Sequence, residues 1–334
     1  MRRIAILGAG AWGTALAVHL AARATQRPYV LLWARDPAQA RALRETRRNE
    51  RYLPGIALPP GIDVVSDGAA VATCDLLVAA VPTGALVETV TRFAPGTQAP
   101  LVWLSKGFLA APDEPAGVAL AHERIGALWS GPVGAVSGPS FADEVARGLP
   151  TALVVAATAP PLASKVAALL RGDTLRAYES QDLVGVETGG AVKNVLAIAA
   201  GASDGLGFGH NARAALVTRG LAETGRLLTA LGGTRDTLMG LAGLGDLVLT
   251  CTGDLSRNRR VGLALAQGRT LPQILTELGH VAEGVGAARA TRRLAARHGI
   301  DMPICAAVDR VLHDGLPVRD AVAQLLQREP RAED

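Results

Sequence analysis

Lysine is scarce in this chain of 334 residues, because only three of its 34 basic residues are lysine. Arginine cannot release its proton at working pH, whereas a desolvated lysine acts as a base, an acid or a compact charge. Each lysine that is present therefore calls for an explanation. Lys165 has the surroundings of an exposed helix position, whereas Lys106 follows a predicted strand and Lys193 falls within an apolar helix, so these two are candidates for chemistry.

Aromatic residues make up only 3% of the chain, and cysteine occurs three times. Few rings leave little material for the stacking platforms that bind single-stranded nucleic acid, and the arginines are scattered. With a mild net charge of +4, a small anionic substrate is the more economical expectation. Cys74, Cys251 and Cys305 are far apart and have no paired spacing, which indicates reduced core thiols in a cytoplasm and gives no metal signature.

Long apolar runs are also missing. No uncharged apolar stretch reaches the roughly 18 to 20 residues that a membrane span needs, and the run from Ile4 to Leu7 is too short for a signal peptide. We therefore expect a cytoplasmic protein with no integral membrane association and no nucleic-acid partner. A hydrophobic content of 49% with 19% charged residues is typical of a folded protein, here of about two domains. The charged stretch Arg328 to Asp334 is expected to be a frayed tail.

Strands and helices alternate through residues 1–181. Repeated strand, short polar turn and helix predict an α/β domain, with a Rossmann-like, doubly wound parallel sheet and helices on both faces. The predicted strands are Arg3–Leu7, Tyr29–Trp33, Asp75–Val81, Leu101–Leu104, Val133–Ser137, Thr151–Ala156 and Thr174–Tyr178. The predicted helices include Thr14–Ala24, Ala38–Asn49 and Leu162–Leu170.

Residues 182–334 carry no further strand signal, so we expect an all-helical second domain that provides the substrate and catalytic part. We expect this apolar domain to mediate a homodimer as well. Its predicted helices are Val184–Ala200, Ala212–Leu231, Arg259–Gln267, Pro272–Leu278, Ala282–Arg297, Pro303–His313 and Val318–Gln327.

The turn after the first strand has the pattern of a dinucleotide site, Gly8-Ala9-Gly10-Ala11-Trp12-Gly13, and it leads into a helix. Gly8 permits a tight turn, Gly10 lets a pyrophosphate approach the helix N-terminus, and Gly13 lets helix and strand pack closely. The strand before it and the helix after it favour a dinucleotide site over a plain glycine-rich connector.

The end of the second predicted strand should read the adenosine ribose. An acid there selects NAD, but this chain has Ala34 and Arg35, and Asp36 follows one step later. Asp36 with a proline after it is typical of a helix N-cap. Arg35 is either a partner for a 2′-phosphate or a solvated surface charge. We predict that NADPH is accepted as well as NADH, with the preference between them left open.

The stretch from Val184 to Gly201 predicts a helix that is apolar on nearly every side, with Glu187 and Lys193 as its only charges. A buried ammonium must find a partner or lose its proton. Helical side chains lean toward the N-terminus, so Lys193 would lie over the bare backbone of Gly189 and Gly190. Either the glycines leave room for the reacting end of a ligand, or another backbone crosses there and Lys193 extends to the surface.

Two later segments are interpreted as loops that carry polar chemistry. In the glycine-rich, apolar stretch from Gly240 to Leu247, Asp246 is either a helix cap or a buried carboxylate that pairs with a lysine. Ser256, Arg257 and Asn258 precede a helix, where a capping serine, backbone amides and an arginine together make a phosphate seat. The alternative for this second segment is a solvated basic turn or a nucleic-acid patch.

Six motifs in this order resemble the bacterial NAD(P)-dependent glycerol-3-phosphate dehydrogenases over essentially the whole chain. The motifs are Gly8 to Leu16, Ser105-Lys106-Gly107, Ser137 to Ala142, Gly189 to Asn194, Gly243 to Leu247 and Ser256-Arg257-Asn258. The resemblance implies interconversion of sn-glycerol 3-phosphate and dihydroxyacetone phosphate with NADH or NADPH, which supplies the backbone of phospholipids.

The resemblance also implies roles for single residues. Lys193 would accept the proton in alcohol oxidation and donate it in ketone reduction. Members of the family often have serine where this chain has Ala11, so a side-chain hydrogen bond to the cofactor is lost there while the backbone amide remains. The implied substrate positions are Lys106, Gly138, Ser140, Lys193, Asp246, Ser256, Arg257 and Asn258. The implied cofactor positions are Gly8, Gly10, Ala11, Trp12, Gly13, Arg35, Lys106, Ala142, Arg257, Val281 and Glu283.

The chemistry of a secondary alcohol explains the need for a lysine, since loss of a hydride gives a carbonyl only if the hydroxyl proton also leaves. Burial and the nearby charge of Lys106 are expected to make Lys193 less basic. Two rivals stay open: a 3-hydroxy acid or phosphogluconate-type dehydrogenase on the same plan, and a dinucleotide-sensing regulator without turnover.

Overall fold

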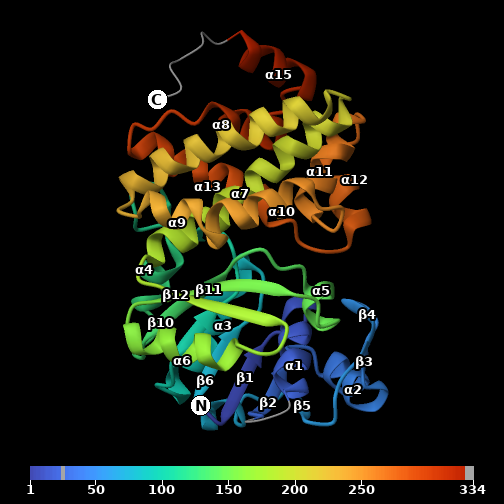
Figure 1. The fold of residues 1–334 in the computed structure, drawn as a ribbon, viewed down its shortest axis with the longest axis vertical. Helices are drawn as coiled ribbons and strands as arrows, with labels where there is room; N and C mark the ends of the chain where they lie inside the picture. Colours follow the sequence, from blue (N-terminus) through green and yellow to red (C-terminus); the bar gives the residue numbers. More distant parts are fainter. Residues whose placement is uncertain (24–26, 328–334) are drawn as a thin grey trace.

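The computed structural model describes residues 1–23 and 27–327. It consists of a sheet-containing part near the N-terminus and a helical part that follows it (Figure 1). The last residue of the expected helix Thr14–Ala24 and the expected tail from Arg328 to Asp334 lie outside the described residues.

The main sheet has eight strands in the order β12-β11-β10-β7-β6-β1-β2-β5. Its central strands are continuous apolar runs because helices cover both faces, and Ile4 and Ile6 of β1 are fully buried. The strands are β1 (Arg3–Leu7), β2 (Tyr29–Trp33), β5 (Ile62–Val65), β6 (Leu76–Ala79), β7 (Leu101–Trp103), β10 (Val133–Ser137), β11 (Thr151–Ala157) and β12 (Leu175–Ser180).

The sheet is mostly parallel, and one edge departs from the prediction. The strands β5, β2, β1, β6, β7 and β10 run parallel, but β11 is antiparallel to β10, and β12 follows the direction of β11. The reason lies in α5 (Ala142–Ala146), which connects β10 to β11. This short helix packs against α1 (Ala11–Ala22) and does not cross the sheet, so the chain turns back at the same end.

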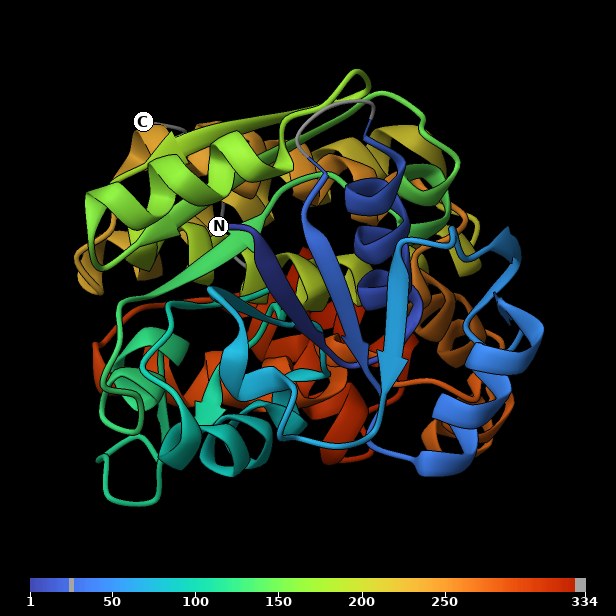
Figure 2. The same ribbon diagram turned by 90° about the horizontal axis from the view of Figure 1, so that it is seen from below.

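Helices α1 and α6 cover one side of the sheet, and α3 and α4 cover the other (Figure 2). The expected helix Ala38–Asn49 is α2 (Pro37–Thr46), which Asp36 caps as predicted by accepting a hydrogen bond from the amide of Ala38 at 2.9 Å. It ends earlier than expected because Arg47 adopts a left-handed φ of 52° and β3 begins. The remaining elements here are α3 (Thr83–Phe93), α4 (Ala121–Gly126), α6 (Pro160–Leu170), the turns η1 (Val71–Thr73) and η2 (Ala94–Gly96), and two hairpins, β3 (Arg48–Asn49) with β4 (Leu53–Ala57) and β8 (Leu109–Ala110) with β9 (Val118–Ala119).

The described residues after β12 contain helices and no strand, as predicted. They are organised around α7 (Leu183–Gly205), against which α8, α10, α11 and α13 pack. The helices are α8 (Gly209–Ala230), α9 (Arg235–Met239), η3 (Leu241–Gly245), α10 (Asp246–Thr252), α11 (Arg257–Ala266), α12 (Leu271–Leu278), α13 (Glu283–Arg297), α14 (Pro303–His313) and α15 (Val318–Leu326).

Helix α7 is the core of this helical part. Among the described residues it alone has the length and hydropathy of a membrane span, but 94% of that stretch is buried inside the protein, as in the core helix of many folded domains. The three cysteines are free and buried, in agreement with their expected role as core thiols.

Candidate active site

Lys193 lies in the middle of α7 and is enclosed by the neighbouring helices. Asp182 fixes the start of the helix, since its side chain accepts a hydrogen bond from the amide of Gly185 at 2.7 Å. Lys193 is only 7% exposed. The alternative in which this side chain extends to the surface is therefore wrong, and the ammonium depends on partners within the protein.

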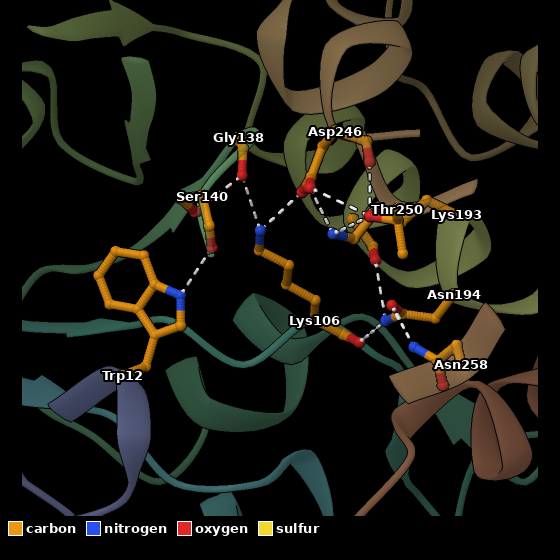
Figure 3. Close-up of polar contacts among 10 residues, drawn as sticks. Trp12, Lys106, Gly138, Ser140, Lys193, Asn194, Asp246, Thr250 and Asn258 are labelled. Atoms are coloured by element: carbon orange, nitrogen blue, oxygen red, sulfur yellow. Dashed lines mark hydrogen bonds and ion pairs between the residues drawn. The ribbon is translucent and has the colours of Figure 1, made fainter. Parts of the chain in front are cut away.

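Those partners are Asp246 and Thr250 of α10 (Figure 3). Lys193 Nζ donates to Asp246 Oδ1 and, at 3.0 Å, to Thr250 Oγ1. The other carboxylate oxygen of Asp246 accepts from Lys106 Nζ at 2.6 Å. The prediction that Asp246 is a buried carboxylate paired with a lysine is confirmed, and it serves two lysines at once.

One carboxylate between two ammonium groups leaves the buried cluster with excess positive charge if both lysines are protonated. Burial lowers the pKa of Lys193 to about 7, an effect that Asp246 opposes and Lys106 adds to. Burial acts to raise the pKa of Asp246, but Lys106 and Lys193 outweigh it and the pKa is lowered. At neutral pH Asp246 is therefore ionised, while Lys193 exchanges between its charged and neutral forms. The lowered pKa of Lys193 agrees with the reduced basicity expected from the sequence.

The hydrogen bonds of Lys193 also fix the direction of its lone pair. A neutral amine has two N–H groups and one lone pair. Asp246 and Thr250 each accept one hydrogen bond from Nζ, which engages both N–H groups. Thr250 is itself held in this role, because its hydroxyl donates to the backbone carbonyl of Asp246 at 2.6 Å. The lone pair is left to accept a proton from a third group.

The space over Gly189 and Gly190 is filled by the protein, which corrects the expectation of a ligand there. A Cβ atom added at Gly189 would lie 3.0 Å from the carbonyl oxygen of Ala242. At Gly190 it would lie 3.1 Å from Ser137 Oγ and 3.5 Å from Cγ of Lys106. The two glycines admit a crossing backbone and the side chain of Lys106, so their function is to bring Lys106 and Asp246 close to α7.

The segment from Gly240 to Leu247 is helical, although the sequence indicated a loop. Residues 241–245 form the π-helical turn η3, and α10 begins at Asp246. Glycine-rich sequence has poor intrinsic helix propensity, but here the turn packs on Gly189 of α7, and tertiary contact compensates. This packing places Asp246 at 1% exposure in contact with Lys193.

Lys106 is anchored from the sheet side of the site. Its Nζ donates to the carbonyl of Gly138 at 3.0 Å, and Ser140 Oγ donates to the same carbonyl at 3.0 Å. Gly138 has a φ of +125°, which only glycine adopts readily, so the turn after β10 needs glycine to present this carbonyl. The backbone carbonyl of Ser140 in turn accepts from Trp12 Nε1 at 3.1 Å. Four predicted residues from three separate motifs therefore form one connected group.

A chain of side-chain amides connects the other half of the site. Asn194 Nδ2 donates to the backbone carbonyl of Lys106 at 3.0 Å, and Asn258 Nδ2 donates to Asn194 Oδ1 at 2.8 Å. Asn258 Oδ1 accepts from the amide of Gly284 at 3.0 Å. Asn258 is thus largely engaged within the protein. It ties the start of α11 and the start of α13 to the segment that carries Lys106.

Ser256 caps α11, as its sequence position indicated. Its side chain accepts from the amide of Arg259 at 3.2 Å. The neighbouring Arg257 is exposed, and its charge interacts with that of Glu283 without forming an ion pair among the described residues. The helix N-terminus and this guanidinium are the two cationic features here that a phosphate requires.

The glycine-rich turn after β1 has the geometry that a dinucleotide needs. Gly8 has a φ of +116°, and a Cβ there would lie 2.7 Å from the carbonyl oxygen of Ala80. Gly10, the N-cap of α1, has no heavy atom within 4 Å of an added Cβ, so its surface is open. A Cβ at Gly13 would collide with the carbonyl of Gly8. The three glycines thus serve a tight turn, an open approach and close packing, and the residues fit a bound pyrophosphate.

The other expected cofactor positions follow strands of the sheet or lie at the start of α13 and just before it. Arg35 is largely exposed and lies 3.8 Å from Glu88 of α3. Glu283, at the start of α13, accepts from the amide of Thr83 at 2.9 Å and so connects the two parts of the chain. Val281 is 49% exposed, and Ala142 opens α5 beside the turn at Ser140.

Asn194 and Thr250 take part in the site, although neither is among the site residues that the sequence predicts. For each of the two residues the sequence contains a feature that is consistent with this role. Thr250 follows Asp246 by four residues, the spacing that places two side chains on one helix face. Asn194 is an amide next to Lys193 in an otherwise apolar helix, and a buried amide needs partners.

Comparison with known proteins gives consistent matches over both parts of the chain. Residues 3–163 match the family model for the N-terminus of NAD-dependent glycerol-3-phosphate dehydrogenase, and residues 182–323 match the model for its C-terminus. The chain is 56% identical to glycerol-3-phosphate dehydrogenase (NAD(P)+) of Aromatoleum aromaticum, over 99% of this chain and 100% of that protein.

Two further matches extend this similarity. The enzyme of the same description from Cupriavidus metallidurans is 53% identical, over 99% of this chain and 100% of that protein. The crystal structure of glycerol-3-phosphate dehydrogenase from Coxiella burnetii has a TM-score of 0.92 at 41% identity, and the match covers 98% of this chain and 99% of that chain.

Proposed function

The chain belongs to the NAD-dependent glycerol-3-phosphate dehydrogenase family, and we propose that it interconverts sn-glycerol 3-phosphate and dihydroxyacetone phosphate with NAD(H) or NADP(H). The observation that carries this proposal is the buried contact of Lys193 with Asp246 and Thr250, which leaves a weakly basic amine with a free lone pair. An alcohol dehydrogenation without a histidine base needs such a group.

We assign most of the cofactor binding to residues 1–181, and the proton chemistry with a few further cofactor contacts to residues 182–334. The turn from Gly8 to Gly13, with Ala11 and Trp12, would hold the pyrophosphate. Arg35 would face the ribose end. The further cofactor contacts are assigned to Lys106, Ala142, Arg257, Val281 and Glu283. The bound nicotinamide supplies a hydride acceptor or donor.

In the direction of oxidation, neutral Lys193 would take the proton of the substrate hydroxyl through its free lone pair. Asp246 holds the amine in place and stabilises the ammonium that forms. In the direction of reduction, the protonated Lys193 would give that proton to the carbonyl oxygen. Lys106, held by Asp246 and Gly138, adds a fixed positive charge where the oxygen becomes negative.

The substrate phosphate is assigned to the N-terminus of α11, with Ser256, Arg257 and Asn258, and the carbon end to Lys106, Gly138, Ser140, Lys193 and Asp246. Since Ser256 and Asn258 are engaged within the protein, their contribution to phosphate binding would come mainly from holding the helix start in place. The exposed guanidinium of Arg257 would supply the charge. Binding at this end would orient the reacting carbon toward the amine of Lys193.

We also infer a cytoplasmic enzyme that acts as a homodimer and supplies glycerol 3-phosphate for phospholipid synthesis. Three buried free thiols suit a reducing compartment, and the helical part has exposed apolar side chains such as Phe208, Val248 and Leu326 that a second copy would cover.

The direct test is an assay of substrate class. Purified protein is incubated with dihydroxyacetone phosphate and either NADPH or NADH, and absorbance at about 340 nm is followed, the usual nicotinamide readout. We expect oxidation of both cofactors. Turnover with a 3-hydroxy acid or phosphogluconate instead would identify a different dehydrogenase, and cofactor binding without turnover of any substrate would indicate a regulator.

A further inference from the structure

Glu187 is a buried charged residue of α7 that the proposed reaction does not use. Its carboxylate accepts a hydrogen bond from the backbone amide of His122 at 3.0 Å, and it is also hydrogen-bonded to the ring Nδ1 of His122 at 2.6 Å. An ionised carboxylate has about four acceptor sites. Glu187 can therefore accept from a further donor that His122 does not supply.

A small cavity lies next to Glu187, between α7 and the ends of two strands of the sheet. Its wall consists of the end of β7 with residues 105–107, the end of β10, Ala121 of α4, and residues 186, 187 and 190 of α7. About 10 Å³ of this cavity is open to the centre of a water molecule, and one buried water needs roughly 10 to 15 Å³ on this measure. The cavity thus has room for a single water and is too small for an organic ligand.

Two buried polar groups on the wall of this cavity lack partners. Trp103 Nε1 and Ser137 Oγ make no hydrogen bond among the described residues, and the two residues are 0% and 3% exposed. Unpaired polar groups are rare in protein interiors because they lose their bonds to water on folding. The indole N–H only donates, the hydroxyl donates or accepts, and the nearby carboxylate of Glu187 only accepts. A water molecule, which has two donors and two acceptors, matches all three groups.

We propose that this cavity is a binding site for one water molecule, and that Glu187 positions Lys106 through it. The water accepts from the indole N–H of Trp103, shares a hydrogen bond with the hydroxyl of Ser137, and donates to the carboxylate of Glu187. Three partners are the usual number for a buried water. A dry cavity would leave Trp103 and Ser137 unpaired.

The partners of this water stand directly before two segments of the candidate active site. Strand β7 ends at Trp103 and leads to Lys106, and β10 ends at Ser137 and leads to Gly138. Lys106 Nζ donates to the carbonyl of Gly138 at 3.0 Å (Figure 3). One water thus links the ends of both strands to Glu187, and it holds the lysine and the carbonyl that binds it in register.

Glu187 also extends a face of α7 that already contacts Lys106. Glu187, Gly190 and Asn194 are three and four residues apart, the spacing of one helix face. Asn194 Nδ2 donates to the backbone carbonyl of Lys106 at 3.0 Å, and a Cβ atom added at Gly190 would lie 3.5 Å from its Cγ. The helix that carries Lys193 therefore holds Lys106 at three positions, one of them through the water. This positioning role rests on the proposed function, whereas the water site does not.

Water-detected NMR tests the site without turnover. Protein labelled with nitrogen-15 at its four tryptophans gives an indole N–H signal for each, and Trp103→Phe identifies the signal of Trp103. Trp33 and Trp129 are internal controls, because their buried indoles donate to the carbonyls of Ser66 and Ala99. We expect a nuclear Overhauser contact with a long-lived water at the indole N–H of Trp103 and at neither control.

The variant Ala135→Val is designed to displace this water. Alternate residues of a strand share a face, and Ala135 and Ser137 of β10 both line the cavity, so the two added methyl groups would fill it. Ala57→Val, at an exposed position of β4, is the matched control. The water contact of Trp103 should vanish in Ala135→Val and persist in Ala57→Val. Ser137→Ala, which leaves the space and removes one partner, should weaken the contact and serves if Ala135→Val does not fold, as judged by circular dichroism.

The positioning role is tested by the pH dependence of turnover. Asp246 raises the pKa of Lys193 and Lys106 lowers it, while burial raises the pKa of the adjacent Cys251 to about 12 and keeps that thiol neutral. If Lys106 loses its position, oxidation of glycerol 3-phosphate by Ala135→Val should require a higher pH than in the wild type. The kcat for reduction should fall by about threefold or more. A smaller folded fraction alone would lower kcat without moving the pH profile.

Absence of a water contact at Trp103 in the wild type would overturn the site, as would a contact that is unchanged in Ala135→Val. Loss of the water in Ala135→Val with the kcat and pH profile of the wild type would overturn the positioning role. Absence of turnover in the wild type would overturn the proposed function and the positioning role together, whereas the water site is judged by NMR alone.

Discussion

Lys193 and Asp246 form an ion pair in the interior of the protein, where their side chains are 8% and 1% exposed. The two residues are 53 positions apart, on α7 and at the start of α10. Because Asp246 also binds Lys106, this pair determines both the basicity of Lys193 and the position of the second lysine.

The activity should depend on pH in opposite ways for the two directions. Oxidation of glycerol 3-phosphate needs neutral Lys193, whose pKa is about 7, so kcat should rise as pH increases through this value. Reduction of dihydroxyacetone phosphate needs the protonated form, so kcat should fall above it. Initial rates at saturating substrate from pH 5.5 to 9 in both directions provide the measurement. Profiles with the same slope in both directions would show that another group limits the rate.

Asp246→Asn should move the oxidation profile toward lower pH. The carboxylate raises the pKa of Lys193 against burial, and its loss removes that opposition. The maximal kcat should also fall, by about 10² or more, because Lys106 loses the partner that positions it. Asp246→Glu, which retains the charge, is the control for the pH shift. A profile that moves to higher pH would contradict the assigned coupling.

Thr250→Val should lower kcat by about tenfold, the effect of one lost hydrogen bond of about 1 to 1.5 kcal/mol. The threonine hydroxyl accepts from Lys193 and thereby directs its lone pair. Thr250→Ser keeps the hydroxyl and should retain most of the activity. If both variants lost activity equally, the methyl group and not the hydroxyl would be the important part.

Gly189→Ala should destabilise the protein by roughly 1 to 3 kcal/mol and reduce activity, because the added methyl group would press on the backbone carbonyl of Ala242 at 3.0 Å. The displaced segment carries Asp246. Gly286→Ala is the matched control within α13, where an added Cβ meets nothing within 4 Å and alanine should stabilise the helix by about 0.5 to 1 kcal/mol. Urea denaturation measures both. Equal free energies of unfolding for the two variants would contradict the close packing at Gly189.

Arg35→Ala should reduce kcat/KM for NADPH more than for NADH, since only NADPH has a 2′-phosphate for this guanidinium to bind. Glu88, 3.8 Å from Arg35, competes for the same charge, so Glu88→Gln should improve the use of NADPH slightly. Steady-state kinetics with both cofactors test the pair. A wild type that strongly prefers NADH, or an equal loss with both cofactors in Arg35→Ala, would leave Arg35 as a surface charge.

The local motifs were predictable because their geometry follows from neighbouring residues. The order of a strand, a glycine-rich turn and a helix predicts the open surface at Gly10. Asp36 and Ser256 are N-cap residues, and each marks the start of its helix in the sequence. The pairing of Asp246 with a lysine could also be predicted from the sequence, since an isolated charge is costly in a protein core.

The errors concern features that tertiary packing determines. The sequence could not show that the turn η3 would fill the space over Gly189, because a glycine-rich stretch becomes helical there only through contact with α7. The reversal of β11 depends on where the short helix α5 packs. Hairpins such as β8 with β9 have strands of two residues, too short for a periodic pattern to appear.

The most direct test of the account is the kcat of Lys193→Arg for reduction of dihydroxyacetone phosphate with NADPH at neutral pH. Arginine keeps the positive charge but does not exchange its proton, so kcat should fall by about 10² to 10⁴ while cofactor affinity is retained. Lys165→Arg, at an exposed lysine of α6, should be fully active. Near-normal turnover by Lys193→Arg would contradict the role of Lys193 as the proton donor and acceptor.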